Sequence, residues 1–222
     1  MFHKGLLGTN VLKATRSIFT PWGRVRHDKL WKPKLVVGLG NPGMDGTRHN
    51  LGAMWVRHIA KQCEAQLEPL PKLNSAVCRL DNPEKTVLMV PTTYMNLSGE
   101  AVKQCITELG ISPDDVAVVH DCLEVEVGEV KIRKKGSLNG HHGLLNIARE
   151  TGHKKLKRLS IGIGRPDSVE EVIDYVLGKP DLEDFAKIEG FAFNFVGNEF
   201  IKELYDAPED KMIGIPVLGH EN

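Results

Sequence analysis

The 222-residue sequence has no long apolar run, few aromatic residues and only four cysteines. No apolar run approaches the roughly 18 residues that a membrane-spanning helix needs, so we do not expect membrane insertion. The cysteines form no Cys-x-x-Cys pair and no histidine stands at ligand spacing, which favours reduced thiols in an intracellular compartment over a disulfide framework or a zinc site. The apolar and charged fractions, 41% and 26%, are ordinary for one globular domain with appendages.

Acidic residues are missing from the first 27 positions, which carry five lysines and arginines, and the first acid is Asp28. A basic, acid-free segment with serine and threonine is typical of an organelle transit peptide, and it lacks the apolar core of a secretory signal. We therefore predict a mitochondrial transit peptide over residues 1–30 and a matrix location. The alternatives are a basic arm that contacts nucleic acid and a cytoplasmic protein.

Beyond residue 33, short apolar segments alternate with segments of helical periodicity. The expected strands lie at 34–39, 76–80, 87–90, 116–119, 129–133 and 159–163, and the expected helices at 55–63, 101–109, 144–149 and 182–195. This order predicts a single-domain α/β three-layer sandwich over residues 34–205, with a mixed, mainly parallel central sheet flanked by helices. Residues 206–222, rich in glycine, proline and charge, are expected to form a tail.

The loop after the first expected strand contains Gly38-x-Gly40-x-x-Gly43, which matches a dinucleotide-binding fingerprint. Pro42 has no amide hydrogen, and a polar run from Thr47 to Asn50 comes before any helical periodicity. No helix N-terminus is therefore expected where a pyrophosphate would bind, and the pattern argues against a nicotinamide or flavin cofactor. We expect no cofactor.

Four polar loops follow expected strand ends, where ligands bind in open α/β sheets. They are 41–50, 91–99, His120-Asp121 and 136–143. With Ile161-Gly-Ile-Gly164 and Val176-Leu-Gly-Lys-Pro180, these blocks closely resemble, in order, the bacterial-type peptidyl-tRNA hydrolase family, including its mitochondrial members. Each block alone is a weak signal, but the ordered series is specific.

The resemblance implies a monomeric enzyme that cleaves the ester between a peptide and the 3′-terminal ribose of tRNA, without metal or cofactor, and so recycles tRNA. His49 matches the family's catalytic histidine and Asp121 its partner acid. A neutral imidazole can take a proton from the attacking water. The carboxylate would hold the imidazole tautomer and stabilise the imidazolium that forms.

The resemblance also implies a set of substrate-binding residues. These are Asn41, Tyr94, Met95, Asn96, His141 and His142. An asparagine amide offers both a donor and an acceptor and can therefore bind a peptide group, whereas the free ammonium of aminoacyl-tRNA presents only donors. An aromatic face such as that of Tyr94 can stack on a terminal base.

Positive charge outside the loops is expected to contact tRNA phosphates without reading sequence. The candidate residues are Lys131, Arg133, Lys134, Lys135 and Arg158. Such a basic run is also typical of a solvated surface.

The chain departs from the family pattern at three positions in or near these blocks. His142 replaces the usual asparagine, Cys122 replaces an acid, and Ser160 stands where many members carry a basic residue. Cys122 beside Asp121 also suggests a Cys-His protease, which the adjacent carboxylate disfavours. Because of His142, the alternative function is a non-catalytic organellar RNA-binding or splicing factor on the same fold.

Overall fold

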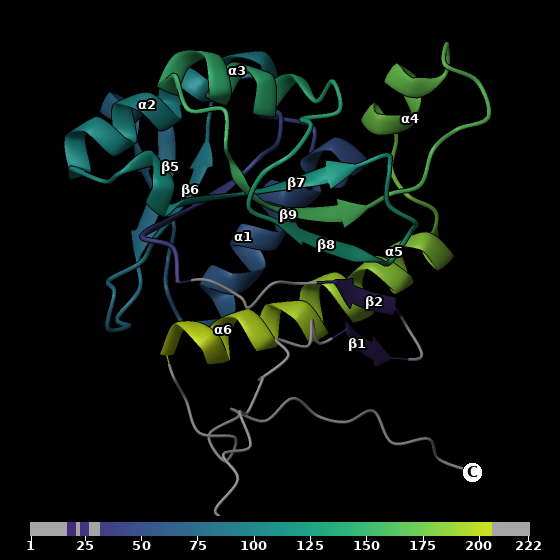
Figure 1. Cartoon of the computed structure of the whole chain (residues 1–222), viewed down its shortest axis with the longest axis horizontal. Helices are drawn as coiled ribbons and strands as arrows, with labels where there is room; N and C mark the ends of the chain where they lie inside the picture. The colour runs from purple at the N-terminus through teal and green to yellow at the C-terminus, as the bar shows by residue number, and fades with distance from the viewer. Residues whose placement is uncertain (1–16, 21–22, 27–31, 206–222) are drawn as a thin grey trace, which may run out of the picture.

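The computed structural model describes residues 17–20, 23–26 and 32–205. In this part of the chain, a nine-stranded sheet lies between two layers of helices, in the order β1-β2-β8-β9-β7-β3-β6-β5-β4 (Figure 1). The strands are β1 (Ser17–Thr20), β2 (Gly23–Arg26), β3 (Leu35–Gly38), β4 (Glu68–Leu70), β5 (Ser75–Arg79), β6 (Val87–Pro91), β7 (Val116–Cys122), β8 (Val130–Arg133) and β9 (Lys157–Gly162). The central strands β6, β3, β7 and β9 are parallel, whereas β5 and β8 join them antiparallel. The predicted mixed α/β sheet with a parallel centre is confirmed.

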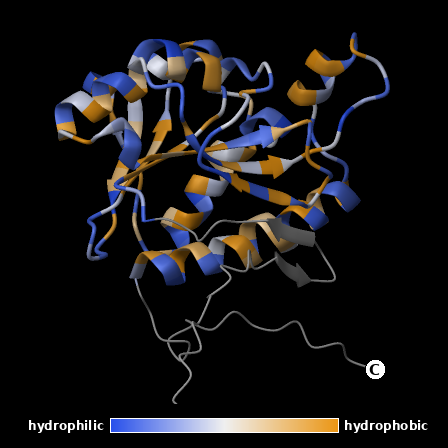
Figure 2. Ribbon diagram, viewed as in Figure 1, coloured by the Kyte–Doolittle hydropathy of each residue, from blue (hydrophilic) through white to orange (hydrophobic). Residues whose placement is uncertain are grey.

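The two faces of the sheet carry separate hydrophobic cores. The helices are α1 (Leu51–Gln62), α2 (Ser98–Leu109), α3 (His142–Thr151), α4 (Val172–Leu177), α5 (Leu182–Ile188) and α6 (Gly197–Tyr205), with a π-helical segment, η5 (Glu189–Val196), between the last two. Along β3, Val36 joins the core under α1 and α6, and its neighbours Leu35 and Val37 join the core under α2 and α3. Alternate strand residues therefore face opposite helical layers. The helices are correspondingly amphipathic, with hydrophobic and hydrophilic residues on different sides (Figure 2).

A glycine allows α1 to approach the middle of the sheet closely. A Cβ atom at Gly52 would lie 2.1 Å from the backbone oxygen of Val119 in β7. No larger residue fits there without moving the helix. This contact holds the short 3₁₀ turn η1 (Arg48–Asn50), which directly precedes α1, beside the carboxyl end of β7. The loop that carries His49 is thereby fixed next to Asp121.

The C-terminal helix and α4 differ from the expectations. The helix expected at 182–195 extends to Tyr205 through the π segment, in which the Ala192 carbonyl accepts a hydrogen bond from the Trp55 indole at 2.8 Å. The helix α4 was not expected. It is six residues long and has no buried side chain, so its sequence carries little periodic signal.

The N-terminal segment expected to be a transit peptide contributes two strands. β1 and β2 pair antiparallel, and β2 pairs parallel with β8 at the sheet edge. The other positions of 1–30, and the expected tail at 206–222, lie outside the described residues, so both assignments stay predictions. Among the described residues, no helix combines the length and the apolar character needed to cross a membrane.

Candidate active site

A cavity of about 350 Å³ lies at the carboxyl ends of the parallel strands. Its walls come from the His49 turn, the end of β7, the loop before α3 and the helix α4. Of the residues predicted to act on the substrate, His49, Asp121, Asn41, Met95, Asn96, His141 and His142 all line it. Most of the predicted side chains therefore lie in one place, as expected for loops at the carboxyl ends of parallel strands, although they are far apart in the sequence.

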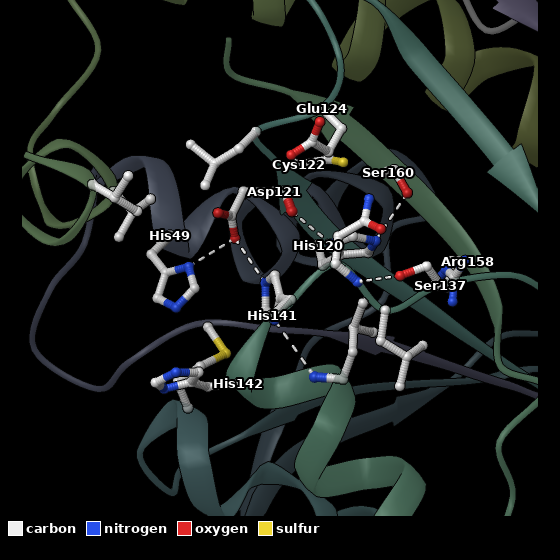
Figure 3. A pocket seen from close by; sticks show the side chains of 18 of the residues that line it. His49, His120, Asp121, Cys122, Glu124, Ser137, His141, His142, Arg158 and Ser160 are labelled. Carbon is white, nitrogen blue, oxygen red and sulfur yellow. Dashed lines mark hydrogen bonds and ion pairs between the residues drawn. The ribbon is translucent and has the colours of Figure 1, made fainter. Parts of the chain in front are cut away.

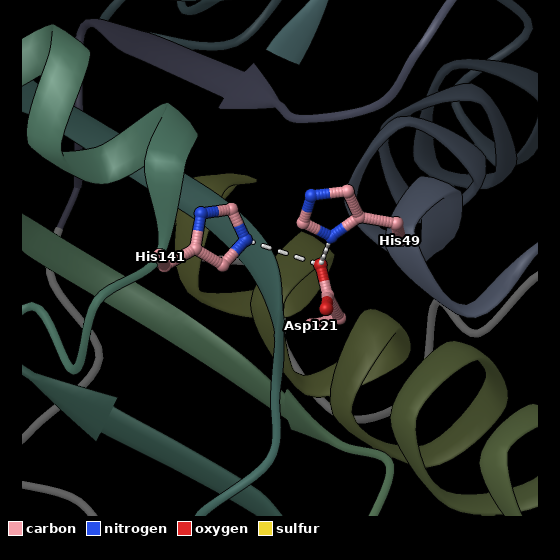
Figure 4. Close-up of side chains that lie close together, drawn as sticks. All are labelled: His49, Asp121 and His141. Carbon is pink, nitrogen blue, oxygen red and sulfur yellow. Dashed lines mark hydrogen bonds and ion pairs between the residues drawn. The ribbon is translucent and has the colours of Figure 1, made fainter. Parts of the chain in front are cut away.

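Asp121 lines the cavity and lies between His49 and His141 (Figure 4). Its Oδ1 atom is 2.9 Å from Nδ1 of His49 and 3.1 Å from Nε2 of His141. The two rings are 4.9 Å apart between centroids. Asp121 is 2% exposed, so both hydrogen bonds reach a carboxylate that is shielded from water.

Hydrogen-bond partners assign a proton to each histidine. The carboxylate of Asp121 can only accept, so the His49 nitrogen facing it, Nδ1, carries a hydrogen. The other nitrogen of a neutral His49, Nε2, then has a free lone pair. In His141 the arrangement is reversed, because Nδ1 accepts the backbone N–H of Leu144 at the start of α3 and Nε2 donates to Asp121. His49 is therefore the histidine suited to accept a proton.

The electrostatics of the pair support this assignment. Burial alone would raise the pKa of the Asp121 carboxyl, but the charges and hydrogen bonds of His141 and His49 lower it well below its usual range. Burial lowers the pKa of His49, whereas the hydrogen bond and charge of Asp121 raise it, and the net pKa lies above 6.5. Asp121 is thus ionised at neutral pH, and His49 is a stronger base than a free imidazole.

Asn41 is held in place by Asn50, a residue to which the sequence analysis gave no role. The Asn41 N–H donates to Oδ1 of Asn50, and Nδ2 of Asn50 donates to the Asn41 carbonyl, each at 2.8 Å. The Asn41 Oδ1 accepts the backbone N–H of Met95 at 2.8 Å. Asn41 therefore has both Nδ2 hydrogens free for a ligand in the cavity, while one lone pair of its oxygen is already used. Asn50 is 1% exposed. The signal available in the sequence was its place at the end of the polar run 47–50.

The other predicted substrate residues lie at the rim. Asn96 and His142 are exposed and line the cavity, and His142 makes no hydrogen bond to Asp121, His49 or His141 (Figure 3). Met95 is 4% exposed and packs against α3, where a Cβ atom at Gly143 would lie 2.5 Å from its sulfur. Tyr94 is 62% exposed and is not among the residues that line the cavity. A stacking role for Tyr94 stays a prediction.

Arg48, also without a predicted role, joins the His49 turn to α4. Its guanidinium donates to the carbonyls of Tyr175 and Lys179, at 3.3 and 2.9 Å, and lies 4.1 Å from the centroid of the Tyr175 ring. Its backbone N–H donates to Gly178. The apolar wall that α4 contributes to the cavity is therefore attached to the residue next to His49.

The predicted phosphate contacts occupy two kinds of position. Lys134 and Lys135 are exposed, and Lys131 and Arg133 are half-buried, with Arg133 lining the cavity. Arg158 is only 2% exposed and donates to the carbonyls of Gly136 and Lys135. Arg158 therefore holds the loop that contains Lys135 and Gly136. A phosphate could reach its guanidinium only through the cavity.

The facing atoms of His49, Asp121 and His141 lie within 4.8 Å of one another, a spacing that could hold a metal ion. A metal on Nε2 of His141 would replace the proton that this nitrogen donates, while Nδ1 already accepts the Leu144 N–H. The arrangement therefore fits a hydrogen-bonded cluster better than a metal centre. Cys122 is buried, and burial raises the pKa of its thiol, which disfavours the protease alternative.

Comparison with known proteins agrees with this geometry. The family model described as peptidyl-tRNA hydrolase matches residues 35–205. A peptidyl-tRNA hydrolase from Rhodopirellula baltica is 42% identical over 70% of this chain and 83% of its own length, and one from a Marinomonas species is 39% identical over 70% and 82%. The crystal structure of peptidyl-tRNA hydrolase from Acinetobacter baumannii is similar with a TM-score of 0.73 at 33% identity, covering 81% of this chain and 92% of that one. The chain belongs to the peptidyl-tRNA hydrolase family.

Proposed function

We propose that this protein hydrolyses the ester that joins a peptide to tRNA in peptidyl-tRNA, releasing the tRNA for reuse. The observation that carries the proposal is the 2.9 Å hydrogen bond between His49 Nδ1 and the buried Asp121 carboxylate. It leaves the basic Nε2 of His49 on a cavity shared with Asn41 and Asn96. Family membership supports the same activity.

The reaction follows from the proton positions. Nε2 of His49 takes a proton from water as the water oxygen attacks the ester carbonyl carbon. Asp121 stabilises the imidazolium that forms. When the bond to the ribose oxygen breaks, the imidazolium returns a proton to that oxygen. The products are a peptide acid and tRNA, and no step requires a metal ion or an enzyme-bound ester.

Discrimination between substrates follows from Asn41. Because Met95 N–H already uses one lone pair of the Asn41 oxygen, Asn41 interacts with a ligand mainly through its two Nδ2 hydrogens. A peptide carbonyl oxygen accepts them, whereas the ammonium of aminoacyl-tRNA offers only donors and leaves them unpaired. Unpaired buried polar groups reduce binding strongly. The enzyme is therefore expected to spare the charged tRNA that translation needs.

The test is tRNA release by the full chain. N-acetyl-aminoacyl-tRNA should be cleaved and free aminoacyl-tRNA should not. His49→Ala should abolish release while tRNA binding remains, and His153→Ala, a matched histidine outside the cavity, should not alter release. If wild-type protein binds tRNA but does not cleave it, the enzyme proposal is wrong and the non-catalytic RNA-binding alternative is favoured.

We also propose that the enzyme is a monomer addressed to the mitochondrial matrix. The basic, acid-free composition of residues 1–27 supports the mitochondrial location. A fluorescent protein fused behind residues 1–30 should enter mitochondria, and retention in the cytosol would contradict the proposal. Sedimentation of the full chain should give the mass of one 24.6 kDa protein.

A further inference from the structure

Behind the Asp121 cluster lies a second pair of buried polar residues, His120 and Ser160. His120 is 4% exposed and Ser160 is 3% exposed. The parallel pairing of β7 and β9 sets these residues opposite each other. His120 lies between Ser160 and the Asp121–His141 pair (Figure 3). Neither side chain has a role in the proposed chemistry.

The hydrogen bonds of His120 fix one tautomer. Its Nδ1 lies 2.5 Å from the backbone oxygen of Asp121, and because a carbonyl can only accept, Nδ1 carries the hydrogen. Its Nε2 then has the lone pair and accepts the Ser160 hydroxyl at 2.9 Å. The Asp121 carbonyl thus sets the tautomer of His120, and the Ser160 hydroxyl holds the other end of the ring by donating to Nε2.

His120 also contacts the second histidine of the cluster. Its ring meets that of His141 edge to face, with 4.9 Å between the centroids and an angle of 84°. The groups that face it are thus Asp121, His141, Ser160 and, through its charge, Arg158. Burial, followed by the charge of His141, lowers the pKa of His120 to about 3, so this ring is neutral in the working range.

We propose that His120, held at Nε2 by Ser160, is a positioning residue that fixes the backbone at Asp121 and the ring of His141. It therefore sets the distance between Asp121 and His49. This role rests on the proposed hydrolase function. Both His120 and Ser160 line the cavity, and the proposed role acts through Asp121 and His141.

The experiment compares variants of the full chain on N-acetyl-aminoacyl-tRNA. Ser160→Ala should lower kcat about fivefold, the loss of one neutral hydrogen bond, with KM unchanged. The acid limb of its pH–rate profile should move to lower pH, because a less well placed Asp121 raises the pKa of His49 by less. The imidazole ¹⁵N shifts should show the Nδ1–H tautomer of His120 in both proteins, with a changed Nε2 shift in the variant because Nε2 no longer accepts a hydrogen bond.

A matched control is Ser75→Ala. Ser75 is equally buried and donates one hydrogen bond to Leu73, but it lies on β5, away from the cavity. It should lower the melting temperature by a similar amount and leave kcat and the acid limb unchanged. If Ser160→Ala behaves in the same way as Ser75→Ala, the positioning role is wrong.

A second pair of variants tests the two nitrogens of the His120 ring separately. The amide of His120→Asn can replace the Nδ1 donor to Asp121, whereas that of His120→Gln reaches only toward Ser160. The asparagine variant should keep about tenfold more kcat than the glutamine variant. Equal losses in the two would overturn the role. An active wild type with unaffected variants contradicts only the positioning role, whereas an inactive wild type overturns the hydrolase function and the positioning role with it.

Discussion

The turn that carries His49 and the start of α3 that carries His141 both bring a histidine to one oxygen of Asp121, through different ring nitrogens. His49 uses Nδ1 and leaves Nε2 on the cavity. His141 uses Nε2, and its Nδ1 caps α3. Two chemically identical side chains thus have different capacities, and the backbone around each decides which one can act as a base.

The two regions also differ in how they are supported. The His49 turn is attached on one side to α4 through Arg48 and on the other to β7 through Gly52. His141 is part of a helix end that packs on Met95 through Gly143. The first region connects the base to a wall that would touch substrate, whereas the second connects Asp121 to the core. This comparison can be tested residue by residue.

The largest effect is expected from the base itself. His49→Asn removes the only free imidazole lone pair of the cluster, so kcat should fall by about 10²- to 10⁴-fold. The same change at His141 should reduce kcat by roughly tenfold, because it removes one charge-assisted donor to Asp121. Single-turnover rates on N-acetyl-aminoacyl-tRNA measure both. Equal losses at the two positions would show that His141 also transfers a proton.

The next largest loss of kcat is expected from removing the charge of Asp121. Asp121→Asn should lower kcat by about 10²-fold, since the imidazolium loses its stabilising carboxylate. In the wild type, only neutral His49 accepts a proton and its pKa is raised, so activity should rise with pH through a midpoint above 6.5. In the variant only burial remains, which lowers that pKa, so the midpoint of kcat/KM against pH should fall. An unchanged midpoint would mean that another group controls the acid limb.

The fold and the meeting of His49 with Asp121 were predictable because both depend on local signals. Short apolar segments gave the parallel strands, and the ends of parallel strands share one edge of a sheet. The contact was therefore predictable although Asp121 follows His49 by 72 residues in the sequence. Helix α4 was missed because it is only six residues long and has no fully buried side chain: Ile173, for example, is 68% exposed.

The supporting contacts could not be predicted, because they depend on register and on which atom is already occupied. That His120 lies opposite Ser160 follows only from the pairing of β7 with β9. Asn41 was expected to offer a donor and an acceptor to the substrate, but Met95 N–H already uses one lone pair of its oxygen. Arg158 belongs to a basic cluster in the sequence but is buried in the sheet. Strand pairing sets the first and the third of these outcomes, and a contact between two loops sets the second.

The two roles of His141 can be separated by amide substitutions. The amide of His141→Asn can replace the Nδ1 cap but does not reach Asp121, whereas His141→Gln reaches Asp121 and loses the cap. The glutamine variant should keep more of the activity and lose about 1 kcal/mol of unfolding free energy. The asparagine variant should show the opposite pattern. Urea unfolding and kcat together decide this, and parallel losses in both variants would mean that the two roles are coupled.

The smallest effect is expected at His142, which lies at the rim and makes no hydrogen bond to the cluster. His142→Asn should change kcat by less than about threefold at any pH, since neither the base nor its partner is touched. His153→Asn, away from the cavity, is the control and should leave kcat unchanged. A fall in kcat of about tenfold or more for His142→Asn alone would show that the His142 side chain takes part in the reaction.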